Sequence, residues 1–211
     1  MGKATVKAGW SCPHVKTCAN SGRGRSGAPS RSSGSGWEVE SEPRRYHPTS
    51  RTRRSVDPLD SLRRRFRYHA WATATLVDAL GSPAPDSAIR PVAHALTADR
   101  VWLLRLRGEP TDGVALWPDF DAAGCRALAR RNAAAYADYL GALAPSDLRQ
   151  SVRYATSSGA THETAVADVL DHVLLHAAHH RGQANAALRA AGGEPPHVDL
   201  IAWLRAGEPE P

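Results

Sequence analysis

Apolar residues recur at intervals of three and four in four segments of the chain, all after residue 56. This spacing places the apolar side chains of each segment on one face of a helix. It predicts helices over residues 57–80, 86–107, 119–144 and 168–191, separated by segments rich in Gly and Pro. Because four amphipathic helices joined by short links can bury their apolar faces only against one another, we predict an all-α four-helix bundle.

Local signals refine these elements. Either Asp86 or Ser87 can cap the second helix, and either Asp119 or Asp121 can cap the third. Residues 151–155 and 161–164 flank a Gly-containing turn, which favours a short hairpin or an extended loop. A short terminal helix is expected over residues 198–205, after the Gly and Pro residues that end the fourth long helix.

The fourth predicted helix is rich in histidine: four of the ten in the chain fall within nine positions, at His172, His176, His179 and His180. Since each helical residue advances by about 100°, His176 and His180 border the apolar stripe, and His172 and His179 lie farther round. Two imidazoles one turn apart can bind one metal ion at distances of about 2.1 Å. A third ligand must then come from elsewhere in the chain.

His94, on the second predicted helix, is the natural third ligand. Ala98 follows it by one turn, so a small side chain leaves space beside the imidazole. Metal sites in helical bundles are built from side chains on facing helices, and a site with three protein ligands keeps positions open for water or substrate. The sequence therefore predicts a metal site at His94, His176 and His180. For each ring alone, a hydrogen-bonded core histidine is the competing interpretation.

Residues 1–56 differ in composition from the rest of the chain. They contain runs of Ser, Gly, Arg and Pro with few aliphatic residues, and such a segment buries too little apolar surface to offset the entropy of ordering it. We therefore expect a disordered extension over 1–56 and a bundle domain over 57–206. A second interpretation is a start site assigned too far upstream, with natural translation beginning near Val56.

The positive charge of the chain lies in its first part. Residues 1–57 carry eleven Lys or Arg against four Asp or Glu, a balance of +7, whereas the remainder carries 16 against 17, a balance of −1. A basic patch on the predicted bundle is not supported. Nucleic acid is therefore not an expected partner of the bundle.

The sequence also bears on the compartment. No apolar run reaches the roughly 18 residues that a membrane-spanning helix needs, and the N-terminus lacks the apolar core of a secretory signal. Cys12, Cys18 and Cys125 are too few for a disulfide framework, and Cys125 fits a small buried residue. Cys12, His14 and Cys18 lack a nearby fourth partner for a zinc knuckle. We expect a cytoplasmic protein that does not enter the membrane.

Several motifs together resemble those of the DinB-like (DinB/YfiT-like) metalloenzyme family, over about residues 57–205. They are YHAWA at residues 68–72, His94 followed by DRVW at 99–102, and above all HVLLHAAHHRGQ at 172–183. The closing segments, GEPP at 193–196 and DLIAWLR at 199–205, are also similar to the family's C-terminal signature.

The resemblance implies a DinB/YfiT-like four-helix bundle that binds a divalent metal ion through His94, His176 and His180. A site of three imidazoles accepts Zn, Ni, Fe or Mn. It further implies a metal-dependent S-transferase that uses a low-molecular-weight thiol and a small electrophilic substrate, and a homodimer. A metal-dependent hydrolase on the same scaffold is one alternative. A non-catalytic stress-response protein, whose metal only joins two helices, is another.

Other polar and aromatic residues receive less specific expectations. Gln183 is placed to hydrogen-bond near the metal, and the role of Arg181 is open. His172 and His179 are expected to be packing or surface residues, and His69 and His197 to serve surface or turn roles. Asp99 is expected to point away from the site as a solvated or salt-bridged residue. Core packing is expected for three tryptophans, Trp71, Trp102 and Trp203.

Overall fold

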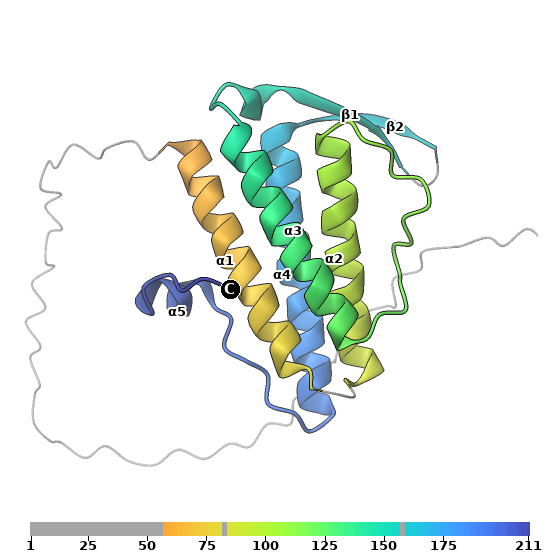
Figure 1. The fold of residues 1–211 in the computed structure, drawn as a ribbon, viewed down its shortest axis with the longest axis vertical. Coiled ribbons are helices and arrows are strands. Elements are labelled where there is room, and N and C mark those ends of the chain that lie inside the picture. The colour runs from red at the N-terminus through yellow and green to blue at the C-terminus, as the bar shows by residue number, and fades with distance from the viewer. Residues whose placement is uncertain (1–56, 82–83, 157–158) are drawn as a thin grey trace, which may run out of the picture. The chain divides into compact units, whose positions relative to one another are not determined.

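The computed structural model describes residues 57–81, 84–156 and 159–211 (Figure 1). The expected disordered extension over 1–56 lies outside these residues, and so do the start near Val56 and the cysteines at positions 12 and 18. The division into 1–56 and 57–206 stays a prediction.

Four long helices form the body of the protein, and the all-α four-helix fold predicted from the sequence is confirmed (Figure 1). In chain order the elements are α1 (Pro58–Ala79), α2 (Asp86–Leu106), α3 (Ala122–Ala142), the 3-10 helix η1 (Asp147–Arg149), β1 (Ser151–Ala155), β2 (Thr161–Ala165), α4 (Val166–Ala190) and α5 (Leu200–Arg205). Helix α2 packs mainly against α4, and α1 packs mainly against α3. None of the described helices is both long and apolar enough to cross a bilayer.

The helix ends follow local chemistry. The Asp57 carboxylate accepts a hydrogen bond from the backbone N–H of Leu59 at 2.8 Å and caps α1. Of the two alternatives for α3, Asp121 is the cap, and it accepts from the N–H of Gly124 at 2.7 Å. The expected cap of α2 is wrong: the helix begins at Asp86 itself, and Pro85 precedes it without a side-chain cap. Pro85 occupies the N-cap position with an extended backbone, and its side chain has no polar atom that could accept a hydrogen bond from the first turn of the helix.

The segment between α3 and α4 is a hairpin, one of the two alternatives predicted for it. Strands β1 and β2 pair antiparallel, with Tyr154 opposite His162. Strand β2 runs directly into α4, and the backbone N–H of Val166 donates to the carbonyl of Gln150. The hairpin therefore lies over one end of the bundle and fixes the start of the histidine-rich helix (Figure 1).

The core has two apolar clusters and a polar layer between them along the helices. One cluster includes Leu76, Leu96 and Leu188, and the other includes Phe66 and Leu170. At intermediate positions of all four long helices lie buried polar residues, namely His69, Thr73, Thr97, Asp99, Asn132, His180 and Arg181. Each of these side chains needs a hydrogen-bond partner inside the bundle, because water does not reach it freely.

The three tryptophans differ in burial. Trp203 of α5 is 1% exposed, which confirms its expected place in the core, and its indole N–H donates to the carbonyl of Pro209 at 2.9 Å. Trp71 and Trp102 are only half-buried. Trp102 instead forms an aromatic cluster with Tyr154 of the hairpin, at 5.0 Å between ring centroids.

Truncating a leucine on α4 should reveal which face of this helix supports the fold. Leu170 is fully buried, so L170A removes apolar contacts and leaves a cavity, and we expect a loss of about 2–5 kcal/mol in the free energy of unfolding. Leu175, on the same helix, is 72% exposed, and L175A should change that free energy by less than about 0.5 kcal/mol. Urea denaturation followed by circular dichroism measures both, and equal losses would contradict this packing.

Candidate metal centre

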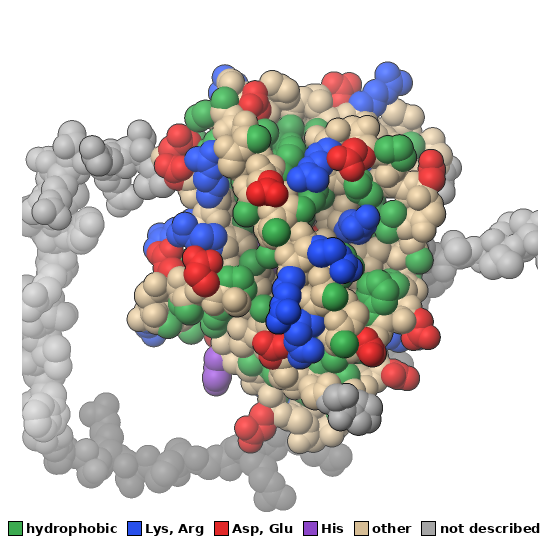
Figure 2. All heavy atoms as spheres, in the orientation of Figure 1, with side chains coloured by type: hydrophobic (Ala, Val, Ile, Leu, Met, Phe, Trp, Pro, Cys, Tyr) green, Lys and Arg blue, Asp and Glu red, His purple; other side chains and the backbone are tan. Residues whose placement is uncertain are grey.

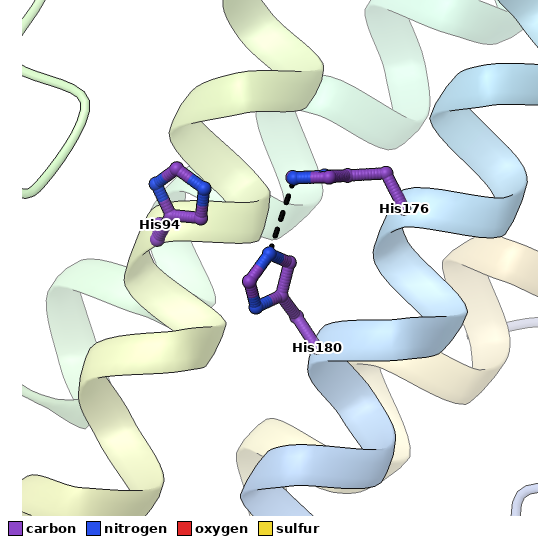
Figure 3. A group of neighbouring side chains, drawn as sticks. All are labelled: His94, His176 and His180. Atoms are coloured by element: carbon purple, nitrogen blue, oxygen red, sulfur yellow. Dashed lines mark hydrogen bonds between the residues drawn. The ribbon is translucent and has the colours of Figure 1, made fainter. Parts of the chain in front are cut away.

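Three histidine rings from two facing helices converge at one point (Figure 3). His94 comes from α2, and His176 and His180 come from successive turns of α4. One ring nitrogen from each lies within 4.8 Å of the other two. The Nε2 atoms of His176 and His180 are 3.1 Å apart. The structure thus brings together the three residues that the sequence singled out.

Two of the three rings are held by a hydrogen bond on the far side. The Nδ1–H of His94 donates to the carbonyl oxygen of Leu116 at 2.8 Å, and the Nδ1–H of His180 donates to Oε1 of Gln183 at 2.7 Å. Because a carbonyl oxygen only accepts, each ring carries its proton on Nδ1 and leaves the lone pair of Nε2 free. This arrangement orients metal-binding histidines in proteins. Gln183 thus lies in hydrogen-bond contact with one of the three rings, and its expected place beside a metal stays a prediction.

His176 differs from the other two rings. Its Nδ1 atom is buried and has no hydrogen-bond partner among the residues that the structure describes. Its Nε2 atom faces the free lone pair of His180, so it carries the proton of that contact. No described partner therefore fixes the tautomer that would expose the Nε2 lone pair of His176.

The protein environment keeps the α4 pair uncharged at neutral pH. Burial, followed by the neighbouring rings of His180 and His94, lowers the pKa of His176 to about 4. Burial also lowers the pKa of His180, against the opposing effect of its hydrogen bond to Gln183. A metal ion binds the neutral imidazole, so this environment prepares both rings for coordination without proton release.

The α4 pair has the nitrogen spacing of two ligands of one divalent cation, and a ring nitrogen of His94 lies within 4.8 Å of both. Two nitrogens, each about 2.1 Å from one ion, stand roughly 3 to 3.4 Å apart for ligand angles between about 90° and tetrahedral, and the 3.1 Å between His176 and His180 lies in that interval. Imidazole is a preferred ligand of Zn, Ni, Fe and Cu. The group contains no carboxylate, and three ligands leave coordination positions open.

Aromatic rings surround the cluster. Trp117, which is 57% exposed, stacks on His94 with 3.9 Å between ring centroids and 10° between planes. On the other side His172 stacks on His176 and meets the face of Trp102 edge-on. His179 is exposed, and its Nε2 is 3.0 Å from the amide nitrogen of Gln183. His172 and His179 are exposed neighbours of the cluster and do not belong to the group of three, in line with the expectation for them.

Three polar residues near the cluster, His69, Asp99 and Arg181, are buried inside the bundle. His69 is 6% exposed and does not serve a surface role. Asp99 is 1% exposed and so is not solvated, and of the two alternatives expected for it the structure shows the pairing one, with His69 as its partner. The Nε2–H of His69 donates to Oδ2 of Asp99 at 3.0 Å, and Nη1 of Arg181 donates to Nδ1 of His69 at 2.9 Å. Arg181, whose role was open, is therefore a buried member of a chain from α4 through α1 to α2. His197 is exposed, as expected.

A signal for this buried chain exists in the sequence. His69 and Thr73 occupy the helical intervals between Phe66 and Leu76, and Asp99 occupies the interval between Leu96 and Leu103. Polar residues at core positions of an amphipathic pattern indicate a buried polar network. By contrast, no pattern of side chains predicts that the backbone carbonyl of Leu116 holds His94.

Comparisons with known proteins agree with this geometry. A family model described as DinB family matches residues 86–210. A crystal structure of a DinB-like protein from Bacillus cereus superposes with a TM-score of 0.51 at 21% identity, covering 63% of this chain and 91% of that chain. At this identity the likeness supports the fold. No curated protein matches the sequence.

The lowered pKa of His176 makes stability depend on pH. The unfolded chain protonates this histidine below about pH 6.5, whereas the folded chain does so only near pH 4, so the unfolded state binds more protons between those values. We expect chelator-treated protein to lose stability as the pH falls from 7 to 4.5, and H176Q to lose less. Urea denaturation at both pH values measures the effect. H197Q, at an exposed histidine outside the cluster, should behave as the wild type, and an unchanged slope in H176Q would contradict the assignment.

Proposed function

The chain belongs to the DinB family, and on that basis we propose that it binds one divalent metal ion through His94, His176 and His180 and acts as a thiol S-transferase on small electrophiles. The observation that carries the proposal is the convergence of three ring nitrogens within 4.8 Å on facing helices. The thiol chemistry rests on the resemblance of the HVLLHAAHHRGQ segment and its flanks to the family.

The neutral charge of the proposed ligands supports a catalytic use of the site. Three imidazoles bring no negative charge, so a bound cation retains its full charge toward its remaining ligands. A divalent cation bound there would lower the pKa of a coordinated thiol and so favour the thiolate at neutral pH. A site with several carboxylate ligands would lower the pKa of a bound thiol less, because the carboxylates offset part of the charge of the cation.

The side chains of this protein orient the ligands and shape the site. The Leu116 carbonyl and Gln183 hold two rings in the tautomer that presents Nε2. Trp117 covers one face of His94, and the stacked ring of His172 covers His176. These apolar faces border the space that a small electrophile would occupy, and they favour a substrate with an apolar or aromatic portion.

The reacting thiol must come from outside the described part of the chain. Its one cysteine, Cys125 on α3, is fully buried in an apolar cluster with Leu128 and Ala88. Burial raises the pKa of the Cys125 thiol to about 11, so it is neither exposed nor ionised at neutral pH. A small thiol cosubstrate therefore fits the site better than the one cysteine of the described residues.

The H176A variant tests the proposal. Removing one imidazole of the α4 pair leaves two ligands, and we expect metal content after dialysis to fall from about one ion per chain to near zero. Metal-dependent consumption of a small thiol with 1-chloro-2,4-dinitrobenzene should disappear with it. Elemental analysis and a thiol assay measure the two effects, and H197A is the matched control.

The outcomes separate the two parts of the proposal. Unchanged metal content in H176A would reject the ligand set. If H176A loses its metal but the wild-type protein does not accelerate thiol transfer, the transferase activity is rejected. The metal site would then serve a hydrolase or a structural role.

Gln183 should tune metal affinity without being a ligand. Q183L removes the acceptor that holds His180, so the ring can adopt the other tautomer, and we expect a metal affinity about 10–100-fold weaker. Q183E keeps an acceptor at the same position and should stay close to the wild type. Competition with a chromophoric chelator measures both affinities, and equal effects of Q183L and Q183E would show that the hydrogen bond is not responsible.

A further inference from the structure

The loop over residues 107–121 joins α2 to α3 and runs back along α2, one of the two helices that carry the clustered histidines (Figure 1). No residue of this loop is buried. It turns at Gly108 and Gly113, whose φ angles of +68° and +76° favour glycine. Figure 2 looks onto the other two long helices, α1 and α3, where charged side chains of both signs lie among hydrophobic ones.

Two consecutive residues of the loop hold the ring of His94. The carbonyl oxygen of Leu116 accepts a hydrogen bond from its Nδ1–H at 2.8 Å. The indole of Trp117 stacks on the same ring, with 3.9 Å between centroids and 10° between planes. Because the hydrogen bond acts at the edge of the ring and the indole covers its face, the two contacts together set its position and its tilt.

The middle of the loop has little else to hold it against the helices. Between residues 110 and 118, which the structure describes in full, the one other hydrogen bond is local, from the N–H of Val114 to the carbonyl of Thr111. Leu116 and Trp117 keep 37% and 57% of their surface exposed, so the loop loses little buried apolar area when it lifts. Segments with few buried contacts open at low free-energy cost.

Closure of the loop and metal binding at His94 reinforce each other. The Nδ1–H of a metal-bound imidazole is a stronger donor than that of a free one, so metal binding strengthens the bond to the Leu116 carbonyl. In return, the closed loop holds the ring with the lone pair of Nε2 free. Linkage makes the two effects equal: closure raises metal affinity by the factor by which the metal raises the ratio of closed to open loop.

We propose that the 107–121 loop is a lid over the metal centre whose closure is coupled to metal binding, with Trp117 as the positioning residue that links the two. The inference rests on the proposed metal site and adds its regulation. The structure shows the closed position. Without metal the lid opens more often and admits an ion or a small molecule, and with metal it closes over the site.

Trypsin cleavage of the full-length A115R variant measures the opening of the lid. The substitution lies at an exposed position and places a cleavage site beside Leu116. Cleavage requires the loop to leave the helices, so its rate follows the population of the open form. We expect zinc chloride, compared with EDTA, to slow cleavage after residue 115 about tenfold, as read by mass spectrometry. A115R/W117A should be cleaved equally fast under both conditions, and A115R/W117F, which keeps a stacking ring, should behave as A115R.

Zinc affinity gives the reciprocal measurement. Competition with a coloured chelator should show that A115R/W117A binds zinc about tenfold more weakly than A115R, the same factor as in the cleavage rates. L116A is the matched control, because it removes the neighbouring exposed side chain and keeps the backbone carbonyl that His94 needs. It should bind zinc as the wild type does.

The outcomes separate the lid from the metal site. A wild type that binds no zinc rejects the metal site and this inference with it. Zinc that binds the wild type but leaves the cleavage of A115R unchanged keeps the metal site and overturns the lid. Equal zinc affinities of A115R and A115R/W117A, or an equal loss in L116A, overturn the role of Trp117.

Discussion

Buried polar side chains impose the main constraint on this bundle, because each must find a partner within it. The hydrogen bonds of these side chains join different helices at one level along the bundle. Asn132 of α3 donates to the carbonyl of Leu96, the hydroxyl of Tyr136 donates to the carbonyl of Asp99, and Arg181 and Asp99 meet through His69. A slip of one helix along another would break several of these bonds, at about 1–3 kcal/mol for each buried group left unpaired. Apolar packing above and below this layer tolerates shifts more easily, so the layer sets the register of the four helices.

The same register aligns the histidine cluster. Asp99 follows His94 by five residues on α2, and Arg181 follows His180 directly on α4. The bonds from Arg181 through His69 to Asp99 therefore hold α2 and α4 at the offset at which His94 faces His176 and His180. The hairpin and the loop that carries Leu116 add local control, one at the start of α4 and the other at the His94 ring. The cluster depends on contacts that lie outside it.

The sequence predicts the helices and the histidine pair because both are periodic. The four long helices lie within a few residues of their expected bounds, and the i, i+4 pair at His176 and His180 followed from the helical repeat alone. The surface role expected for His69 was wrong, Asp99 was left between solvent and an ion pair, and the role of Arg181 was open, because an angle on one helix does not reveal what the neighbouring helix presents. A polar residue at the edge of a stripe is solvated or buried according to that neighbour. The backbone carbonyl of Leu116 and the cap of α2 depend on loop geometry, which residue types specify only weakly.

Helix α4 serves the cluster and the polar layer at once, and their charges interact. Arg181 places a buried positive charge one residue from His180, which by itself would disfavour a cation at the three histidines. Asp99 acts in the opposite sense: its carboxylate raises the pKa values of His176 and His180 against the larger effect of burial, so its negative potential reaches both rings. A negative potential that favours a proton also favours a metal cation at the same nitrogens. The charges of Arg181 and Asp99 therefore oppose each other at the three histidines, and no carboxylate belongs to the group itself.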